Sequence, residues 1–246
     1  MNQKKKTSQT VFITGAATGI GLATAKLLLS QGYNVTIFSL TKPSLQDMEI
    51  LAAMPRALVL IGNICNSTQV KKALSATIKK FGSIDILINN AGISLHKPFK
   101  ETTSIEWDSL INVNIKGMLT VTQCALPYLR KGGLASPKHR EGGLIINIAS
   151  DSALHPIPYL PIYSLTKAAV LNFSQSLDHE IKPFIRSIAV IPGSTNTDLF
   201  KKSFPSHTAL YQPEDIAHVI AKVISGKQKP NKEGIINPFK HIFNKD

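Results

Sequence analysis

The stretch TVFITGAATGIGLATAKLLLSQG, residues 10–32, joins a β-branched run to a helical pattern through a glycine-rich turn. The run Thr10–Thr14 is typical of a strand, and the apolar spacing after it is typical of a helix that Gly32 ends. Glycine permits a tight turn and lets a ligand approach the backbone closely. The free amides at a helix start favour a phosphate group. We therefore predict a strand, a pyrophosphate-binding turn at residues 14–21 and a helix, with a purely structural turn as the alternative.

The alternation of strand and helix continues along the chain. Nearly continuous apolar runs at residues 85–92 and 143–150 are typical of parallel strands that are buried on both faces. Helical patterns separate these runs, including one long tract over residues 103–130. We predict an α/β fold with a single doubly wound, Rossmann-like domain over residues 10–246, in which about seven mostly parallel strands have helices on both faces. Residues 1–9 are predicted to be a flexible basic N-terminus.

Composition narrows the classes of partner. The 246 residues are 43% hydrophobic and carry a net charge of +13. The lysines are dispersed and are not interleaved with aromatic residues, so we expect cofactor phosphates or an acidic substrate rather than nucleic acid as their partner. Two distant cysteines match no metal spacing and no disulfide framework, which favours a cytoplasmic protein without a metal. No apolar run approaches about 18 residues, so we expect no membrane span.

Turn motifs also follow the later strands. NNAG at residues 89–92 ends one predicted strand, Ser150 ends the next, and PGSTNT at residues 192–197 follows another. The carboxyl ends of parallel strands meet at one edge of an open sheet, which is where ligands bind. Each motif alone could be an ordinary turn, but their common position predicts a binding site at this edge.

The end of the second predicted strand bears on the cofactor. Dinucleotide folds that bind NAD place an acidic residue there, against the ribose 2′-hydroxyl. The corresponding residue here is Ser39, and Thr41 and Lys42 follow it closely. These side chains could bind a 2′-phosphate, which a carboxylate would repel. We therefore favour NADP over NAD.

The segment YSLTK places Tyr163 and Lys167 four residues apart, on one face of a predicted helix. Such a pair is often just a solvated feature of a surface helix. A cation about 4 Å from the phenol would instead stabilise phenolate by roughly 4 kcal/mol at an effective dielectric of about 20. That could lower the tyrosine pKa by up to ~3 units and make the pair a general acid and base near neutral pH.

Taken in order, the motifs TGxxxGxG, NNAG, NxxG, Ser, YxxxK and PGxxxT make residues 10–225 resemble the short-chain dehydrogenases/reductases. The resemblance implies that Asn114 orders a relay water, Ser150 binds the substrate oxygen, Tyr163 is the general acid/base, and Lys167 holds the nicotinamide ribose and lowers the tyrosine pKa. Including Ser39, Thr41 and Lys42, the predicted cofactor contacts are Gly15, Thr18, Gly19, Ile20, Gly21, Ser39, Thr41, Lys42, Asn63, Ile64, Asn89, Ala91, Gly92, Tyr163, Lys167, Pro192, Gly193, Thr195 and Thr197.

These observations predict an NADPH-dependent reductase that interconverts a carbonyl and a secondary alcohol by hydride transfer. Its substrate is expected to be a small carbonyl or alcohol compound, and 3-oxoacyl thioesters on an acidic carrier are one candidate class. The alternatives are an NAD-dependent alcohol or hydroxysteroid-type dehydrogenase and a non-catalytic NADP-binding sensor. The resemblance also implies a homodimer or homotetramer packed through the long helices.

Overall fold

A seven-stranded parallel sheet forms the centre of the computed structural model, which describes residues 8–132 and 142–238. Its strands are β1 (Thr10–Thr14), β2 (Asn34–Ser39), β3 (Ala57–Ile61), β4 (Ile86–Asn89), β5 (Gly143–Ile148), β6 (Ile185–Val190) and β7 (Ile235–Ile236). Their order is β3-β2-β1-β4-β5-β6-β7, and every neighbouring pair is parallel. The predicted doubly wound α/β fold is confirmed. Strand order reverses between β1 and β4, where such sheets bind ligands.

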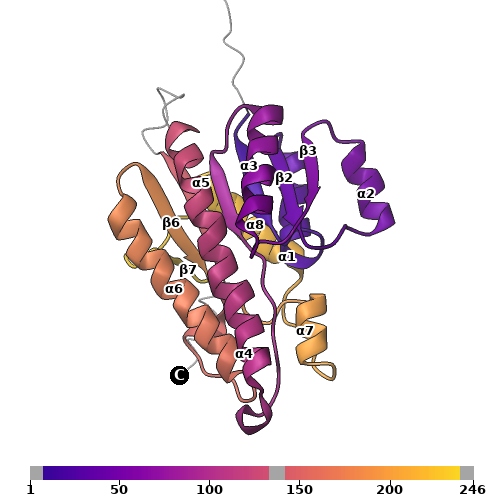
Figure 1. Ribbon diagram of the computed structural model, residues 1–246, viewed down its shortest axis with the longest axis vertical. Helices are drawn as coiled ribbons and strands as arrows, with labels where there is room; N and C mark the ends of the chain where they lie inside the picture. Colours follow the sequence, from indigo (N-terminus) through magenta and orange to yellow (C-terminus); the bar gives the residue numbers. More distant parts are fainter. Residues whose placement is uncertain (1–7, 133–141, 239–246) are drawn as a thin grey trace, which may run out of the picture.

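Helices cover both faces of this sheet. They are α1 (Gly19–Ser30), α2 (Leu45–Ala52), α3 (Ser67–Phe81), α4 (Ser104–Ile111), α5 (Met118–Gly132), α6 (Pro161–Ile181), α7 (Asp198–Ser203) and α8 (Pro213–Ile224), with short 3-10 turns η1 (Phe99–Glu101) and η4 (Asp151–Ala153). In Figure 1, α3, α5 and α6 lie in front of the sheet and α1 and α8 lie behind it. The segment with α7 projects from the carboxyl edge of the strands. Residues 1–7 of the predicted flexible N-terminus are outside the described residues.

The long tract predicted over residues 103–130 is helical, but it is not one regular α-helix. It begins with a capping box, in which Thr103 and Glu106 bond each other's main-chain amides. Between α4 and α5 the chain adopts a π-helical turn, η2 (Asn112–Gly117). Such turns are rare and are frequent at functional sites. The turn contains Asn114, whose side chain is buried in the interior.

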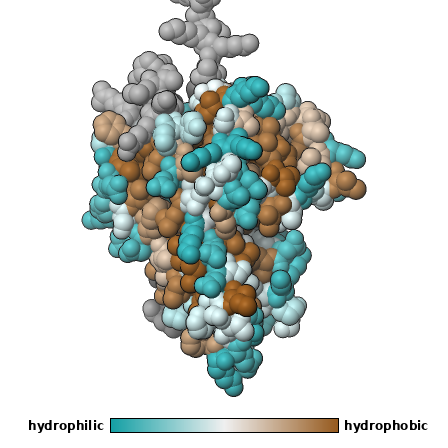
Figure 2. Space-filling model, in the orientation of Figure 1, coloured by the Kyte–Doolittle hydropathy of each residue, from teal (hydrophilic) through white to brown (hydrophobic). Residues whose placement is uncertain are grey.

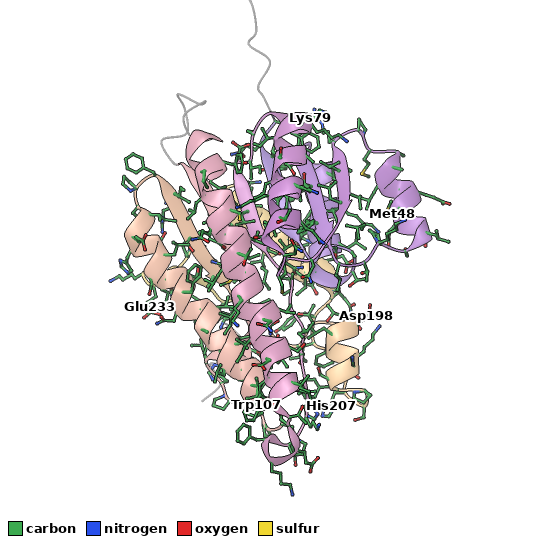
Figure 3. The ribbon with its side chains drawn as sticks, viewed as in Figure 1. Met48, Lys79, Trp107, Asp198, His207 and Glu233 are labelled. Carbon is green, nitrogen blue, oxygen red and sulfur yellow. The ribbon has the colours of Figure 1, made fainter. Side chains whose placement is uncertain are left out.

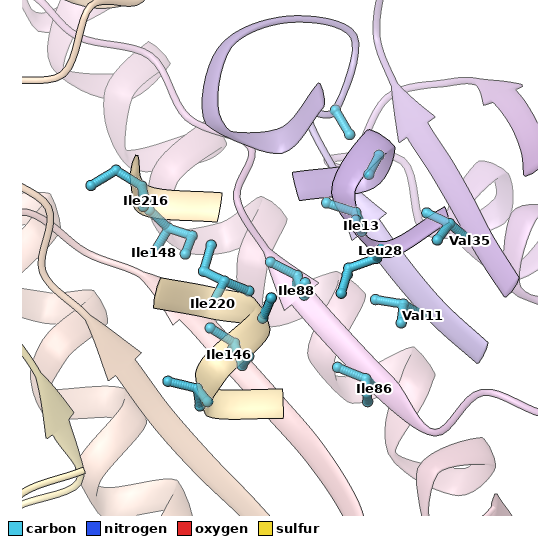
Figure 4. Close-up of a cluster of buried hydrophobic side chains, with 14 of the residues drawn as sticks. Val11, Ile13, Leu28, Val35, Ile86, Ile88, Ile146, Ile148, Ile216 and Ile220 are labelled. Carbon is cyan, nitrogen blue, oxygen red and sulfur yellow. The ribbon is translucent and has the colours of Figure 1, made fainter. Parts of the chain in front are cut away.

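Two larger apolar clusters among the described residues hold the layers together, with a smaller third one where α6 packs on β6 and β7. On one face, β-strand residues pack against α1 and α8, and Figure 4 shows Ile13, Leu28 and Ile220 among this cluster. On the other face, Phe12, Leu87 and Ile145 pack against α3, α5 and α6. The alternation of side chains along each strand therefore supplies both clusters, which explains the continuous apolar runs in the sequence. The strand ends are fixed by this double packing, and they carry the site described below.

A buried carboxylate joins the end of α6 to β6. Asp178 is 3% exposed and accepts hydrogen bonds from Arg186 Nε at 2.8 Å and from the Ser187 amide at 2.9 Å, with Lys182 Nζ at 2.7 Å. Burial raises the pKa of Asp178, but the bonds from Arg186, Lys182 and Ser187 together outweigh it and hold the pKa below its ordinary value. Asp178 thus stabilises the packing of α6 on the sheet in its ionised form.

We predict that Asp178→Ala lowers the free energy of unfolding by about 2–3 kcal/mol, because the buried Ser187 amide loses its acceptor. Urea unfolding at neutral pH measures this change. The control Lys182→Ala removes only a part-exposed ion pair and should cost less than about 1 kcal/mol. The contribution of Asp178 is complete above its unfolded pKa of about 3.9 and is lost as the pH falls through its lower folded value. A variant as stable as the parent would contradict this account.

Candidate active site

A cavity of about 790 Å³ lies at the carboxyl edge of the sheet. The turn between β1 and α1, the ends of β2 to β6 and the α7 segment all contribute to its wall. The predicted site residues that line it are Gly15, Thr18, Gly19, Ile20, Ser39, Thr41, Asn63, Ile64, Ala91, Gly92, Ser150, Tyr163, Lys167, Pro192, Gly193, Thr195 and Thr197. Four predicted residues, Gly21, Lys42, Asn89 and Asn114, are not part of this lining. The motifs separated in sequence are therefore brought to one place.

The turn after β1 is pressed against the end of β4. Gly15 has a φ of +65°, and a Cβ atom on it would lie 2.6 Å from Ala91 Cα. The Asn90 side chain donates to the Thr14 carbonyl at 3.0 Å and to the Gly15 carbonyl at 2.9 Å. Thr14 Oγ1 in turn accepts from the amides of Asn90 and Ala91. Sequence reasoning missed Asn90, although it lies within the NNAG motif.

The start of α1 fits the pyrophosphate of a dinucleotide. Gly19 has a φ of +56°, and the preceding N-cap residue, Thr18, makes no side-chain hydrogen bond to the first turn. That turn contains no acidic residue, so its own side chains bring no anion against its amides or the positive end of the helix dipole. Gly21 lies one step inside the helix, where a Cβ atom would come within 2.5 Å of Asn90 Nδ2. Its role is close packing rather than contact with the cavity.

The ends of β2 and β3 border the part of the cavity where the adenosine portion of a dinucleotide would lie. Ser39 is 6% exposed, and its carbonyl accepts from the Gly62 amide, which joins the two strand ends. Ser39, Thr41 and Asn63 line the cavity. Lys42 is exposed and lies outside the lining, because the chain has already turned away from the sheet edge. Within the described ranges, the acidic residues of the wall are Asp151 and Asp198, so no carboxylate lies at the β2 end.

The side chains of Asn89 and Asn114, which were predicted to contact ligands, form hydrogen bonds within the protein. Asn89 points into the α5 side of the sheet and donates to Thr122 Oγ1 and Asn147 Oδ1, both at 2.8 Å. The strand alternation that directs Asn90 toward Gly15 directs Asn89 to the opposite face, where its side chain bonds other strands and α5, and the cofactor contact of Asn89 stays a prediction. The Asn114 side chain bonds both main-chain groups of Ile93 and donates to Thr166 Oγ1 at 3.0 Å. It ties the end of β4 to α6.

Ser150, Tyr163 and Lys167 meet at the centre of the wall. Ser150 follows β5, and its hydroxyl lies beside Tyr163 on α6, near enough to lower the pKa of the phenol. One turn later, Lys167 is 6% exposed, and its Nζ donates to the Ile148 carbonyl at 2.8 Å. The same Nζ lies 5.6 Å from the centre of the Tyr163 ring. A hydroxyl, a phenol and an ammonium group therefore surround one point of the cavity.

Burial dominates the electrostatics of this group. It raises the pKa of Tyr163 to about 12; the Ser150 hydrogen bond opposes the rise, and the negative charge of Asp151 adds to it. Burial also lowers the pKa of Lys167 to about 8. The predicted lowering of the tyrosine pKa is thus not found in the protein alone, because loss of solvation outweighs the opposing effect of Ser150. At neutral pH Tyr163 is a protonated phenol, which makes it a proton donor.

The far end of the cavity is closed by aromatic side chains. Phe200, Phe204 and His207 line it from the α7 segment, and His96 packs on Phe204 with ring centres 4.8 Å apart. Figure 3 shows the labelled Asp198 near one end of this segment and His207 near the other. Ser203 Oγ donates to Ser94 Oγ at 3.0 Å, which joins the segment to the loop after β4.

Two absences concern only the part of the chain that the structure describes. There, no three His, Cys, Asp or Glu side chains cluster closely enough to bind a metal ion. No helix among residues 8–132 and 142–238 is both long and apolar enough for a membrane crossing.

Comparison with known proteins gives a consistent result. Residues 9–208 match the short chain dehydrogenase family. An uncharacterized oxidoreductase of Staphylococcus aureus strain N315 is 32% identical over 226 residues, which cover 92% of this chain and 94% of that protein. The structure of a 3-ketoacyl-(acyl-carrier-protein) reductase from Brucella melitensis complexed with NADH is 29% identical, with a TM-score of 0.76 and 94% of each chain covered. Levodione reductase, at 24% identity and a TM-score of 0.82 over 96% of this chain and 98% of its own, shares the fold.

We predict that Gly15→Ala weakens NADPH binding about tenfold or more, because the new methyl group would push the β1 turn away from Ala91. Titration of nucleotide fluorescence measures the affinity. Gly32→Ala is the matched control: its φ is +87°, and nothing lies within 4 Å of the added atom. Both variants should lose about 1–2 kcal/mol of stability from the left-handed backbone, but only Gly15→Ala should lose affinity. Equal affinities would show that the close approach is not needed.

Proposed function

The chain belongs to the short-chain dehydrogenase family, and from this membership we propose that it interconverts a carbonyl and a secondary alcohol, acting mainly as an NADPH-dependent reductase. The observation that carries the proposal is the meeting of Ser150, Tyr163 and Lys167 in a cavity that also contains the glycine turn. A proton donor and a dinucleotide-shaped cradle then face the same space. This combination suits hydride transfer coupled to proton transfer.

In this mechanism each residue has a distinct task. When bound, the nicotinamide supplies a hydride to the carbonyl carbon, or accepts one in the reverse direction. Ser150 donates a hydrogen bond to the substrate oxygen and stabilises the charge that develops there. Tyr163 gives its phenolic proton to the same oxygen, and its high pKa keeps that proton available at neutral pH. Lys167 places a positive charge behind the phenol and stabilises the phenolate that forms when the proton leaves, until solvent returns a proton to it.

Asn114 has a supporting task in the proposal. Its side chain holds the end of β4 and Thr166 of α6 at a fixed separation. Because Lys167 follows Thr166, this bond also fixes the position of the ammonium group. The side-chain amide of Asn114 already forms hydrogen bonds to Ile93 and Thr166 within the protein. That Asn114 also orders a relay water remains a prediction.

The lining at the end of β2 supports NADP as the favoured cofactor over NAD. Ser39 and Thr41 offer hydroxyl groups, and no described carboxylate at this end of the cavity would repel a 2′-phosphate. Lys42 is close in sequence but outside the lining, so the proposal rests on Ser39 and Thr41. A preference for NAD would instead favour the alternative dehydrogenase.

The identity of the substrate among small carbonyl compounds remains a proposal. One similar structure is that of a 3-ketoacyl-(acyl-carrier-protein) reductase, which keeps 3-oxoacyl thioesters among the candidates for this chain. The first test is therefore oxidation of NADPH and NADH with a short 3-oxoacyl thioester and a panel of cyclic ketones. Binding of NADPH without turnover of any of them would favour the non-catalytic sensor.

Exposed apolar side chains support the proposed homodimer or homotetramer. Ile105 on α4 is 80% exposed and Leu165 on α6 is 53% exposed. Figure 2 shows hydrophobic side chains mixed with hydrophilic ones on the face that these helices form. Association of two copies through these helices would bury such residues and would also brace the helix that carries Tyr163.

We predict that Tyr163→Phe retains NADPH affinity but lowers kcat by about 10²–10⁴-fold, because the proton donor is lost. Steady-state turnover and fluorescence titration measure the two quantities. Tyr33→Phe removes the same hydroxyl group from a part-buried tyrosine outside the cavity and should leave turnover unchanged. Near-normal turnover in Tyr163→Phe would disprove the assigned role.

We predict that Ser39→Asp shifts the ratio of NADPH to NADH affinity at least about tenfold toward NADH, because the carboxylate repels a 2′-phosphate and accepts from a 2′-hydroxyl. Affinities for both nucleotides should be measured side by side. Ser30→Asp adds the same charge at the exposed end of α1 and controls for net charge. An unchanged ratio would show that Ser39 does not determine the choice between NADPH and NADH.

A further inference from the structure

Four large apolar side chains of the α7 segment, residues 198–210, line the cavity. They are Leu199, Phe200, Phe204 and Leu210. Leu199 is 37% exposed and Leu210 is 68% exposed, although leucine is most often buried. Apolar side chains that stay exposed together in a cavity mark a site for an apolar ligand. This part of the wall therefore fits the portion of a substrate that does not react.

Phe204 is the centre of a cluster of rings. Its ring centre lies 5.3 Å from that of Phe200, 4.8 Å from that of His96 and 5.6 Å from that of His207. His96 also meets the ring of Tyr159 edge on, with 5.4 Å between the ring centres. Phe200, Phe204 and His207 line the cavity. A ligand ring that enters here extends the cluster through the tilted and edge-on contacts that aromatic rings prefer.

The apolar wall continues toward the helix that carries the proposed proton donor. The Lys97 amide donates to the Tyr159 carbonyl at 2.7 Å, which joins the loop after β4 to the segment before α6. In that segment Ile157 and Leu160 line the cavity. Leu160 directly precedes α6 and therefore lies within about one turn of Tyr163. One substrate can thus reach from the ring cluster to the phenol of Tyr163.

The charges in the wall disfavour a substrate with an anionic group beside its carbonyl. Within residues 8–132 and 142–238, Lys167 is the only Lys or Arg that lines the cavity. Lys201 and Lys202 of the α7 segment are exposed and lie outside the lining. Asp151 Oδ1 accepts the hydrogen bond of Ser150 Oγ, so a negative charge lies beside the proposed reacting oxygen. A substrate carboxylate there would meet a charge of the same sign.

We propose that the ring cluster around Phe204 binds an uncharged aromatic ring of the substrate, with Phe204 as the specificity-determining residue. The substrate class is then uncharged ketones that carry an aryl group and the corresponding secondary alcohols, a conclusion that rests on the proposed carbonyl reduction. The rings of the wall distinguish a phenyl group from a saturated ring of similar size. The charge of Asp151 excludes the corresponding 2-oxo acids.

The test compares three carbonyl compounds with the same chain: 4-phenyl-2-butanone, 4-cyclohexyl-2-butanone and 2-oxo-4-phenylbutanoate. We expect kcat/KM with NADPH to be about fivefold higher for the phenyl ketone than for the cyclohexyl ketone. It should be about tenfold or more higher than for the 2-oxo acid. A 2-oxo acid reduced as well as the phenyl ketone would overturn the uncharged substrate class.

Three variants assign the preference to the ring cluster. Phe204→Leu keeps an apolar side chain but removes the ring, so it should bring the ratio of phenyl to cyclohexyl ketone close to one. Phe204→Tyr keeps the ring and should keep the preference. Phe99→Leu is the matched control, because Phe99 stacks on Trp107 outside the cavity lining, and it should keep the ratio of the parent protein. Equal losses for both ketones in Phe204→Leu would overturn the inference, since Phe204 would then only shape the cavity.

A binding measurement separates this inference from the proposed function. The affinity of 4-phenyl-2-butanol for the protein–NADPH complex, read from nucleotide fluorescence, is expected to exceed that of 4-cyclohexyl-2-butanol about fivefold. The two affinities should become equal in Phe204→Leu. That result without turnover of any ketone would support the ring site and contradict the reductase. Turnover with equal kcat/KM for the phenyl and cyclohexyl ketones would overturn the ring site and leave carbonyl reduction intact.

Discussion

The close approach of the β1 turn to the end of β4 is the constraint on which the rest of the site depends. Gly15 can touch Ala91 only because it lacks a side chain, and the Asn90 amide group bonds the carbonyls of Thr14 and Gly15 across the same gap. This contact fixes the start of α1 and hence the amides that face the cavity. It also fixes the loop after β4, which the Asn114 side chain bonds through Ile93. One backbone contact thus aligns the cofactor cradle with the helix that carries Tyr163.

The proposed chemistry uses a charged side chain in a buried position, where its charge destabilises the folded protein. Lys167 is 6% exposed, and burial lowers its pKa to about 8, so its charged form destabilises the folded protein at neutral pH. The bond to the Ile148 carbonyl compensates only in part. Elsewhere on the same helix, Asp178 anchors α6 to β6 through three donors. The C-terminal end of α6 is therefore held by Asp178, whose charge is hydrogen-bonded. The end of α6 near the cavity carries Lys167, whose charge is destabilised by burial.

Local patterns made the fold and most of the cavity predictable. Apolar periodicity located the strands, and motifs at strand ends share one edge in any parallel sheet, which is why Ser39, Ser150 and Thr197 were found from sequence. Properties that depend on the face or the depth of a side chain were not predictable. Asn90, for which no role was predicted, bonds the β1 turn, while Asn89 points to the opposite face because successive strand residues alternate. The direction of the Tyr163 pKa shift required knowing how deeply the phenol is buried.

Asp151 shows why adjacency in sequence did not reveal a role. It follows Ser150 directly and lines the cavity, yet its effect on Tyr163 depends on how the fold brings the end of β5 against α6. A negative charge there favours the protonated phenol of Tyr163 and so favours proton donation to a carbonyl over proton removal from an alcohol. One carboxylate therefore acts on the phenol of Tyr163 and, through its Oδ1, accepts the hydrogen bond of the Ser150 hydroxyl.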